Sequence, residues 1–597
     1  MPTDGTSDLD GSMGISRRQA IQLMGTSATL ALAGCAGVTN DGGGGGEGGL
    51  ADGTLTMYDE ANPEKIQWNN YYGKKVNSRV VRKHLFDPLA KAPSYTSKVD
   101  PSETVDHPDL HPVMAKEWSI DGETASVTLK DGYKWHNGDD VTAKDVVTQF
   151  TIEKHLELPT WSALSGVSAA DEKTVEFSLA STPVNESILF VQLLAIRPLT
   201  TPASIYKEHV KKLENGGKAA KEEFINTKIE EPIGNGPFKI DDVASQQYKL
   251  VAHDGHPASD AINYDVEVAY VEEVERMQQG LKSDELDAVE RYPVPKKVQK
   301  EFPDHVETFP FPAAGGGCIL FNLEKEPWSN RNVRKAFAWL IDRKKVAENA
   351  LDWSVTPRTI TGLPPGLVES WVGGDFLEAN YEIYEPNQKK AETLLKGEGF
   401  TRENGTWLTP DGEELSAPIV APNAGTYDDV GESAAAMLSE FGINAELVTK
   451  SSAAYGQAID NGDFELVVTM HGSGQMHYYT ILQDDFNKRK LPPTGMSMER
   501  EVPMPVGSPD GDLQTVNLQG KIDSLVTATS EKETQQLLRE ITWVYNQDVP
   551  SINPHFWVVT DYLTSDHWDY PDPTDEAFFN AVPLTLPKLG KLTATEK

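Results

Sequence analysis

Very few residues in this chain have the types and spacing that catalysis or metal binding requires. The run from His471 to Gly474 approaches a nucleophile elbow but lacks the first glycine of the G-x-S-x-G pattern. His253 and His256 could ligate a metal, yet no further ligands adjoin them, which favours a polar loop. H-E-x-x-H, Walker and C-x-x-C motifs do not occur. The sequence therefore predicts no catalytic residue, no metal site and no cofactor.

The two cysteines add no chemistry of their own. Cys35 and Cys318 are too few for a disulfide framework or a cysteine-rich zinc site. Cys318 follows three glycines, 315–317, and precedes an apolar strand. This context predicts a small buried hydrophobic residue rather than a nucleophile.

The charge balance excludes one class of partner. The chain has 597 residues, with 54 Lys and Arg against 91 Asp and Glu and a formal net charge of -37. Nucleic acid would repel such a polyanion at long range, so no nucleic-acid partner is expected. The acidity fits either an ordinary exported protein or one adapted to molar salt, and its spread along the chain favours the second interpretation.

The beginning of the chain has the pattern of an export signal. Arg17 and Arg18 resemble a twin-arginine pair, and they precede an apolar run, 20–34, that is too short to span a bilayer. The run leads into Leu-Ala-Gly before Cys35, which is similar to a lipobox. Residues 1–35 are therefore predicted to be an export signal with Cys35 lipidated; the alternative is an ordinary apolar cysteine at a helix end.

A glycine-rich segment, 36–52, follows the predicted signal. Five consecutive glycines within it offer no side chain to bury and great backbone freedom. This segment is expected to act as a flexible tether that holds a folded body off the membrane.

Apolar spacing beyond the tether predicts both helices and strands. The clearest helix is expected over 331–350, where Asn330 can cap and apolar residues recur at i, i+3, i+4, i+7 and i+8. Other segments follow the same rules: helices are predicted within 391–399, 430–441 and 537–545, and strands over 125–129 and 464–470. The mixture indicates an α/β chain whose length suits three or four lobes.

Two local features are predicted to be structural. Gly234 and Gly236 flank Asn235 in a turn that is expected to require positive φ. Arg334 and Asp342 are eight positions apart on one helix face and are expected to make structural hydrogen bonds.

One long motif carries a family resemblance. Residues 321–346, FNLEKEPWSNRNVRKAFAWLIDRKKV, resemble the signature of the family 5 extracellular solute-binding proteins, which include dipeptide- and oligopeptide-binding components of ABC importers. The shared features are an FN strand end, a proline, a short turn, V-R-x-A and a later D-R. Further segments match the family in the same order: 81–89, 112–147, 231–240, 399–400, 441–443 and 461–465.

The resemblance implies a fold and a domain order. The fold class is α/β, a two-lobed clamp like the periplasmic binding proteins (type II, similar to cluster C) with an extra inserted domain. Lobe I is expected to comprise 53–90, 225–307 and 555–597, the inserted domain 91–224, and lobe II 308–554. Hinge crossings near 307 and 555 would let the lobes close on a ligand.

The resemblance also places a ligand site. After the strand at 464–470, peptide-binding members carry a Trp and, three positions on, an Asp that holds the ligand's ammonium, but no Asp or Glu occurs here between Glu465 and Asp484. The expected pocket residues are Phe86, His471, Gly472, Ser473, Gln475, Asn553, His555 and Phe556. Such a pocket suits a neutral or polyhydroxylated solute, or a peptide held by its backbone. The alternative is that these are loop and core residues outside any site.

The implied function is capture of a solute, a peptide or another small polar molecule, at the extracellular face of the cell membrane, followed by delivery to an ABC permease. The expected partners are the solute, the permease subunits and the membrane, reached through a lipid on Cys35. The protein is expected to be monomeric and to catalyse no reaction. Signal, lipidated cysteine, tether and acidic body together resemble exported substrate-binding lipoproteins of halophilic archaea. The alternative is a secreted α/β hydrolase, against which the missing catalytic motif counts.

Overall fold

The computed structural model arranges its longer strands in three sheets. It describes residues 53–72, 78–92, 110–271, 273–292, 294–350, 354–423, 426–472, 477–489, 492–573, 575 and 581–595. All of them belong to one compact unit, residues 51–597. The predicted export signal with Cys35, the tether up to residue 52, and the predicted site residues Ser473 and Gln475 lie outside the described residues.

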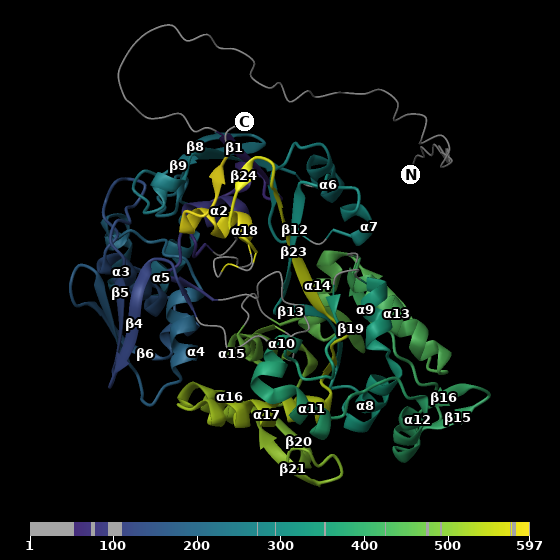
Figure 1. Cartoon of the computed structure of the whole chain (residues 1–597). Coiled ribbons are helices and arrows are strands. Elements are labelled where there is room, and N and C mark those ends of the chain that lie inside the picture. Colours follow the sequence, from purple (N-terminus) through teal and green to yellow (C-terminus); the bar gives the residue numbers. More distant parts are fainter. Residues whose placement is uncertain are drawn as a thin grey trace, which may run out of the picture. The chain divides into compact units, whose positions relative to one another are not determined.

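The largest sheet takes its strands from distant parts of the chain (Figure 1). Its order is β12-β23-β11-β1-β10-β9-β8, with the bounds Val306–Pro312, Phe556–Thr564, Ala288–Val289, Gly53–Asp59, Tyr264–Tyr270, Gln247–Ala252 and Phe238–Ala244. β1 runs parallel to β10 and β11, whereas β12 and β23 pair antiparallel. A short strand, β14 (Ser354–Val355), also pairs with β23. The buried side chains of β1 and β10 form the core beneath this sheet.

A five-stranded sheet lies within the predicted lobe II. Its order is β18-β17-β19-β13-β22, with the bounds Leu447–Lys450, Ile419–Pro422, Leu466–Gly472, Gly315–Phe321 and Ser551–Ile552. β17 is parallel to both of its neighbours, and β13 is antiparallel to β19 and β22. The predicted strand at 464–470 is confirmed as β19.

The third sheet lies in the middle of the predicted inserted domain. Its antiparallel order is β4-β5-β7-β6, with the bounds Ala115–Asp121, Thr124–Leu129, Thr174–Leu179 and Leu164–Ala169. The helix α3 (Ala143–His155) packs on this sheet and against α5 (Ala203–Asn226). The predicted strand at 125–129 is confirmed as part of β5.

The helix predicted over 331–350 is two helices, so that prediction is wrong in its extent. α8 spans Arg331–Leu340 and α9 spans Arg343–Ala350. Asn330 caps α8 as expected, because its side chain accepts from the backbone N–H of Asn332. Ile341 is extended, with φ -82° and ψ 108°, and Asp342 accepts the backbone N–H of Lys345 at 3.2 Å in the first turn of α9. The apolar stripe runs across both helices and therefore hides the break.

The other predicted helices are confirmed. They are α12 (Gln388–Gly397), α13 (Thr426–Glu440) and α17 (Glu531–Asp548). Gly442, which follows α13, has φ +95°, a conformation that glycine adopts readily. In the part of the chain that the structure describes, no helix combines the length and apolar character needed to cross a membrane.

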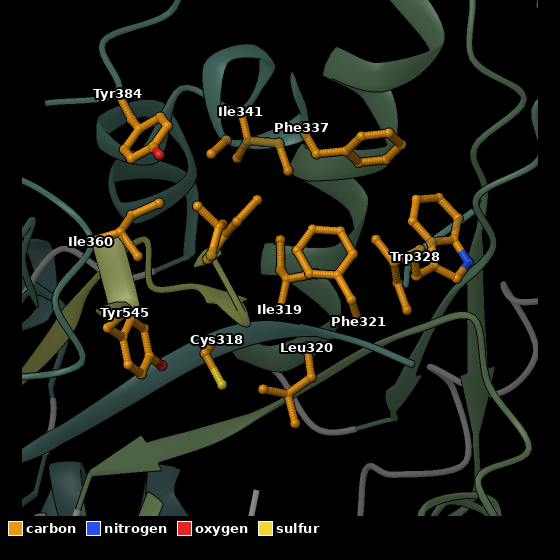
Figure 2. Packing of buried hydrophobic residues seen from close by; sticks show 14 of the residues in the cluster. Cys318, Ile319, Leu320, Phe321, Trp328, Phe337, Ile341, Ile360, Tyr384 and Tyr545 are labelled. Carbon is orange, nitrogen blue, oxygen red and sulfur yellow. The ribbon is translucent and has the colours of Figure 1, made fainter. Parts of the chain in front are cut away.

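β13 runs through a large hydrophobic core (Figure 2). Its side chains alternate, with Ile319 and Phe321 on the face toward Phe337 of α8, and Cys318 and Leu320 on the opposite face. Phe321 and Phe337 meet edge to face with ring centroids 6.0 Å apart. Cys318 is fully buried, which confirms the prediction of a small hydrophobic residue.

Candidate functional site

The chain passes between the large sheet and the five-stranded sheet at two neighbouring places. It crosses at 313–314, between β12 and β13, and again at 553–555, between β22 and β23. The backbone N–H of Ala313 donates to the carbonyl of Trp557 at 2.8 Å, which joins the first crossing to the start of β23. Asn553, His555 and Phe556 therefore lie at the second crossing and beside the first.

The glycines that open β13 make this approach possible. A Cβ on Gly316 would overlap the carbonyl oxygen of His555 and would lie 2.8 Å from the Cα of Phe556. A Cβ on Gly315 would lie 2.5 Å from the carbonyl oxygen of His471. Because no side chain fits at these positions, the backbone of β13 packs directly on the backbone of His471 and His555. This packing brings His471, at the end of β19, next to His555.

Hydrogen bonds and ring contacts hold His471, His555 and Phe556 together. The Nε2 of His471 lies 3.2 Å from the carbonyl oxygen of His555, and its ring meets Phe556 edge to face at 4.3 Å. The backbone N–H of Gly317 donates to the Nε2 of His555 at 3.3 Å. These bonds assign opposite tautomers: His471 carries its proton on Nε2 and presents a bare Nδ1, whereas His555 carries its proton on Nδ1.

Both Nδ1 atoms are buried and have no hydrogen-bond partner among the described residues. Burial lowers the pKa of His555 to about 4, so this ring is neutral near pH 7. An unpaired buried polar atom costs free energy that a ligand can recover by forming the missing bond. The pair presents one acceptor, on His471, and one donor, on His555.

Asp485 is a residue of the candidate site that the sequence reasoning missed. The backbone N–H of Gly472 donates to its Oδ1 at 2.8 Å. Burial raises the pKa of Asp485 to about 8, so the carboxyl is mostly protonated and uncharged at pH 7. Asp485 lies just after Asp484, where the stretch without Asp or Glu ends, and α15 (Tyr478–Gln483) returns it to the end of β19. The sequence shows an Asp beyond the strand, but neither its burial nor its return to the end of β19 could be predicted from it.

The remaining predicted residues are placed as follows. Asn553 is buried, and its Oδ1 accepts from the Ser551 hydroxyl at 3.2 Å. Phe86 belongs to the core of the large sheet, and its carbonyl accepts from the Lys588 ammonium at 3.0 Å. The structure thus brings together His471, Gly472, Asn553, His555 and Phe556, and it places Phe86 in a different core.

The loop with His253 and His256 is structural. The Nε2 of His256 lies 3.0 Å from the Oδ2 of Asp87, and the Lys588 ammonium forms an ion pair with the same carboxylate. Burial opposes the charge of Asp87, yet these two partners lower its pKa. Across the described residues, no group of three or more His, Cys, Asp or Glu side chains could hold a metal ion.

The prediction that Gly234 and Gly236 need positive φ is wrong. Neither glycine is in that region of φ. The reason for glycine is a close approach instead, because a Cβ on either would overlap a carbonyl oxygen at the end of helix α2 (Arg79–Leu85), which is distant in the sequence. The side chain of Asn235 between them accepts the backbone N–H of Asp87 at 2.8 Å and donates to Leu199 O at 3.0 Å.

A cavity of about 880 Å³ has a lining different from the predicted site. It is bounded by the β4–β5 turn, the segment 182–187, Trp371, His477, Tyr478 and the segment 528–534. Trp371 and Tyr478 meet at 4.8 Å between ring centroids. Among the predicted ligand residues that the structure describes, none lines this cavity.

His477 makes the stability of the fold depend on pH. Its Nδ1 accepts the backbone N–H of Tyr479 at 3.2 Å, and its Nε2 lies 3.2 Å from the Ser187 hydroxyl. Burial lowers its pKa to about 3. The unfolded chain takes up this proton below about pH 6.5 while the native ring excludes it, so the contribution of His477 to stability is lost as pH falls from about 6.5 to about 3.

We expect His477→Gln to lose less stability than the unmodified protein between pH 7 and pH 4.5, measured by thermal unfolding at constant salt. Asp485 acts in the opposite sense, because its raised pKa makes the native state bind the extra proton between about pH 8 and pH 4. The difference between variant and parent removes that common contribution. His155→Gln, in α3, is the matched control, and an unchanged pH slope in His477→Gln would contradict the assignment.

Comparison with known proteins identifies the family. The model of the bacterial extracellular solute-binding proteins, family 5 (Middle), matches residues 109–489, more than half of the chain. The dipeptide-binding protein DppE of Bacillus subtilis is 27% identical over 323 residues, which cover 50% of this chain and 55% of that protein. The aligned stretches span about half to two thirds of the length of the first curated relatives.

Solved structures share the fold. The oligopeptide-binding protein AppA of Bacillus subtilis, in complex with a nonapeptide, has a TM-score of 0.63 at 18% identity, covering 91% of this chain and 99% of that one. An oligopeptide-binding protein of Thermotoga maritima with bound mannohexaose has a TM-score of 0.66 at 19% identity, covering 92% and 99%. This chain belongs to the family 5 extracellular solute-binding proteins and has their two-lobed α/β fold.

Proposed function

We propose that this protein captures an uncharged polar solute, or a peptide bound through its backbone, outside the cell and delivers it to an ABC permease. Family membership supports the solute-binding role. The ligands named for its relatives support a peptide or a polyhydroxylated solute as the ligand. One relative is a dipeptide-binding protein, and two similar structures hold a nonapeptide and mannohexaose.

The pair of histidines at the crossings carries the proposal about ligand chemistry. The bare Nδ1 of His471 accepts a hydrogen bond and the protonated Nδ1 of His555 donates one. A peptide group or a sugar hydroxyl offers both a donor and an acceptor. The protonated Asp485 beside Gly472 adds no negative charge that would select an ammonium group.

Several finer features belong to the same proposal. Residues 1–35 direct export and the lipid on Cys35 anchors the protein, with 36–52 as the tether. The two lobes close about the crossings, the protein acts as a monomer without turning over its ligand, and the acidic surface suits molar salt. The named relatives are binding proteins, which favours this reading over a secreted hydrolase.

A thermal-shift screen of di- to pentapeptides, with free and blocked amines, against oligosaccharides tests the proposal. Ligand at ~100 times its Kd should raise the free energy of unfolding by ~2.7 kcal/mol, whether or not the amine is blocked. His555→Phe should weaken binding by about tenfold because the Nδ1 donor is lost. His155→Phe, outside the crossings, is the matched control. Binding that requires a free amine, or conversion of the ligand to a product, would show the proposal to be wrong.

A further inference from the structure

Another cavity, of about 500 Å³, lies where α2 meets α3 and α5, away from the crossings. Its polar lining includes Tyr71, Arg82 of α2, Gln149 of α3, Arg197 and Lys221 of α5. The described lining contains three cationic side chains and no Asp or Glu. In a chain with 91 acidic against 54 basic residues, this is a local reversal of the overall charge.

Two of the three cations already have carboxylate partners. The Nη1 of Arg197 lies 3.2 Å from the Oε1 of Glu153, and the ammonium of Lys221 lies 2.9 Å from the Oε1 of Glu157. The second oxygen of Glu153 accepts from the Thr160 hydroxyl at 2.5 Å. Both oxygens of Glu153 therefore already have a partner, and neither is paired with Arg82.

Arg82 is the cation of this lining whose charge has no carboxylate partner among the described residues. Its Nε is shielded from solvent, and its guanidinium forms neither a hydrogen bond nor an ion pair with any described residue. Burial, together with the positive charge of Arg197, lowers the pKa of Arg82. Two arginines thus line one cavity, one paired and one unpaired, and an anion between them would relieve both the desolvation and the mutual repulsion.

We propose that this cavity binds a small oxyanion between Arg82 and Arg197, with Lys221 at its rim. The planar guanidinium groups match two oxygens of phosphate or a carboxylate at once. Tyr71 lines the same cavity, and burial raises its pKa, so its hydroxyl stays protonated as a further donor. The bound anion would link α2, which packs on the large sheet, to helices of the predicted inserted domain. This site is separate from the solute site at the crossings.

Titration calorimetry with inorganic phosphate, at pH 7 and constant ionic strength set with chloride, tests the site. We expect saturable binding by the unmodified protein and binding at least about tenfold weaker by Arg82→Gln. Lys116→Gln removes one exposed lysine that is not part of this lining, and this variant should bind phosphate as the unmodified protein does. Acetate in a parallel titration shows whether a carboxylate, such as the end of a peptide, can replace phosphate in the cavity.

A second measurement separates binding from a change in folding. Without phosphate, Arg82→Gln should melt no lower than the unmodified protein, because it removes a half-buried charge that has no carboxylate partner among the described residues. In saturating phosphate the unmodified protein should have the higher melting temperature of the two. If Arg82→Gln does not fold, Lys221→Gln at the rim should still weaken phosphate binding by about threefold. No saturable phosphate binding, or equal binding by the Arg82 and Lys116 variants, would overturn the site.

Discussion

Gly316→Ala should destabilise the protein by about 3 kcal/mol and remove solute binding. The new Cβ would overlap the carbonyl oxygen of His555 and press on the Cα of Phe556 at 2.8 Å. Both contacts are backbone atoms, one in the crossing and one at the start of β23, and backbone cannot move aside as a flexible side chain can. The strand β23 must therefore shift away from β13, and the hydrogen bond from Gly317 to His555 is lost with it. Denaturant unfolding gives the stability, and the thermal-shift screen gives the binding.

Gly456→Ala is the matched control for that variant. Gly456 lies in α14 (Ser452–Asn461), and a Cβ there meets nothing within 4 Å. The substitution should be neutral or stabilise the protein by up to about 1 kcal/mol, since alanine favours a helix over glycine. Equal stability of the two variants would contradict the close packing of the crossings.

Arg334→Met should cost about 3 to 5 kcal/mol of unfolding free energy. The Arg334 guanidinium is fully buried, with its Nη2 2.6 Å from the Oδ1 of Asp548, and its Nη1 donates to the carbonyls of Trp328 and Ser329 at 2.6 and 2.8 Å. Methionine fills the space but leaves these buried acceptors without donors and weakens the neutralisation of Asp548. These bonds confirm the predicted structural role of Arg334. The prediction that Asp342 shares its helix face is wrong, because α8 ends at Leu340 and Asp342 lies in the break before α9.

Arg500→Met provides the control because Arg500 pairs with the same carboxylate. Its Nε and Nη2 each lie 2.9 Å from an oxygen of Asp548, but its side chain is 16% exposed and its loss leaves Arg334 in place. We expect a cost of about 1 kcal/mol in denaturant unfolding. If both variants cost the same, the carbonyl contacts of Arg334 contribute nothing.

Much of the local structure followed from the sequence. The Asn330 cap, the helices at 388–397, 426–440 and 531–548, and the burial of Cys318 depend on residues within a few positions of one another. The ordered motif from 321 to 346 also led to the family. Two predictions were wrong because the sequence was compatible with two backbone geometries. The apolar pattern of 331–350 fits one long helix as well as two helices, and a glycine at 234 fits a turn with positive φ as well as a close approach of backbone.

What only the tertiary structure decided is which polar groups meet. His471 and His555 are 84 positions apart, and Arg334 and Asp548 are 214 apart. Asp485 lies 13 positions after Gly472, yet its side chain accepts the backbone N–H of that glycine. Periodicity and capping are set by neighbours along the chain, whereas a hydrogen bond between distant segments depends on how the two sheets pack. The glycines of β13 were visible in the sequence, but only the backbone of His555 pressed against them shows why no other residue fits there.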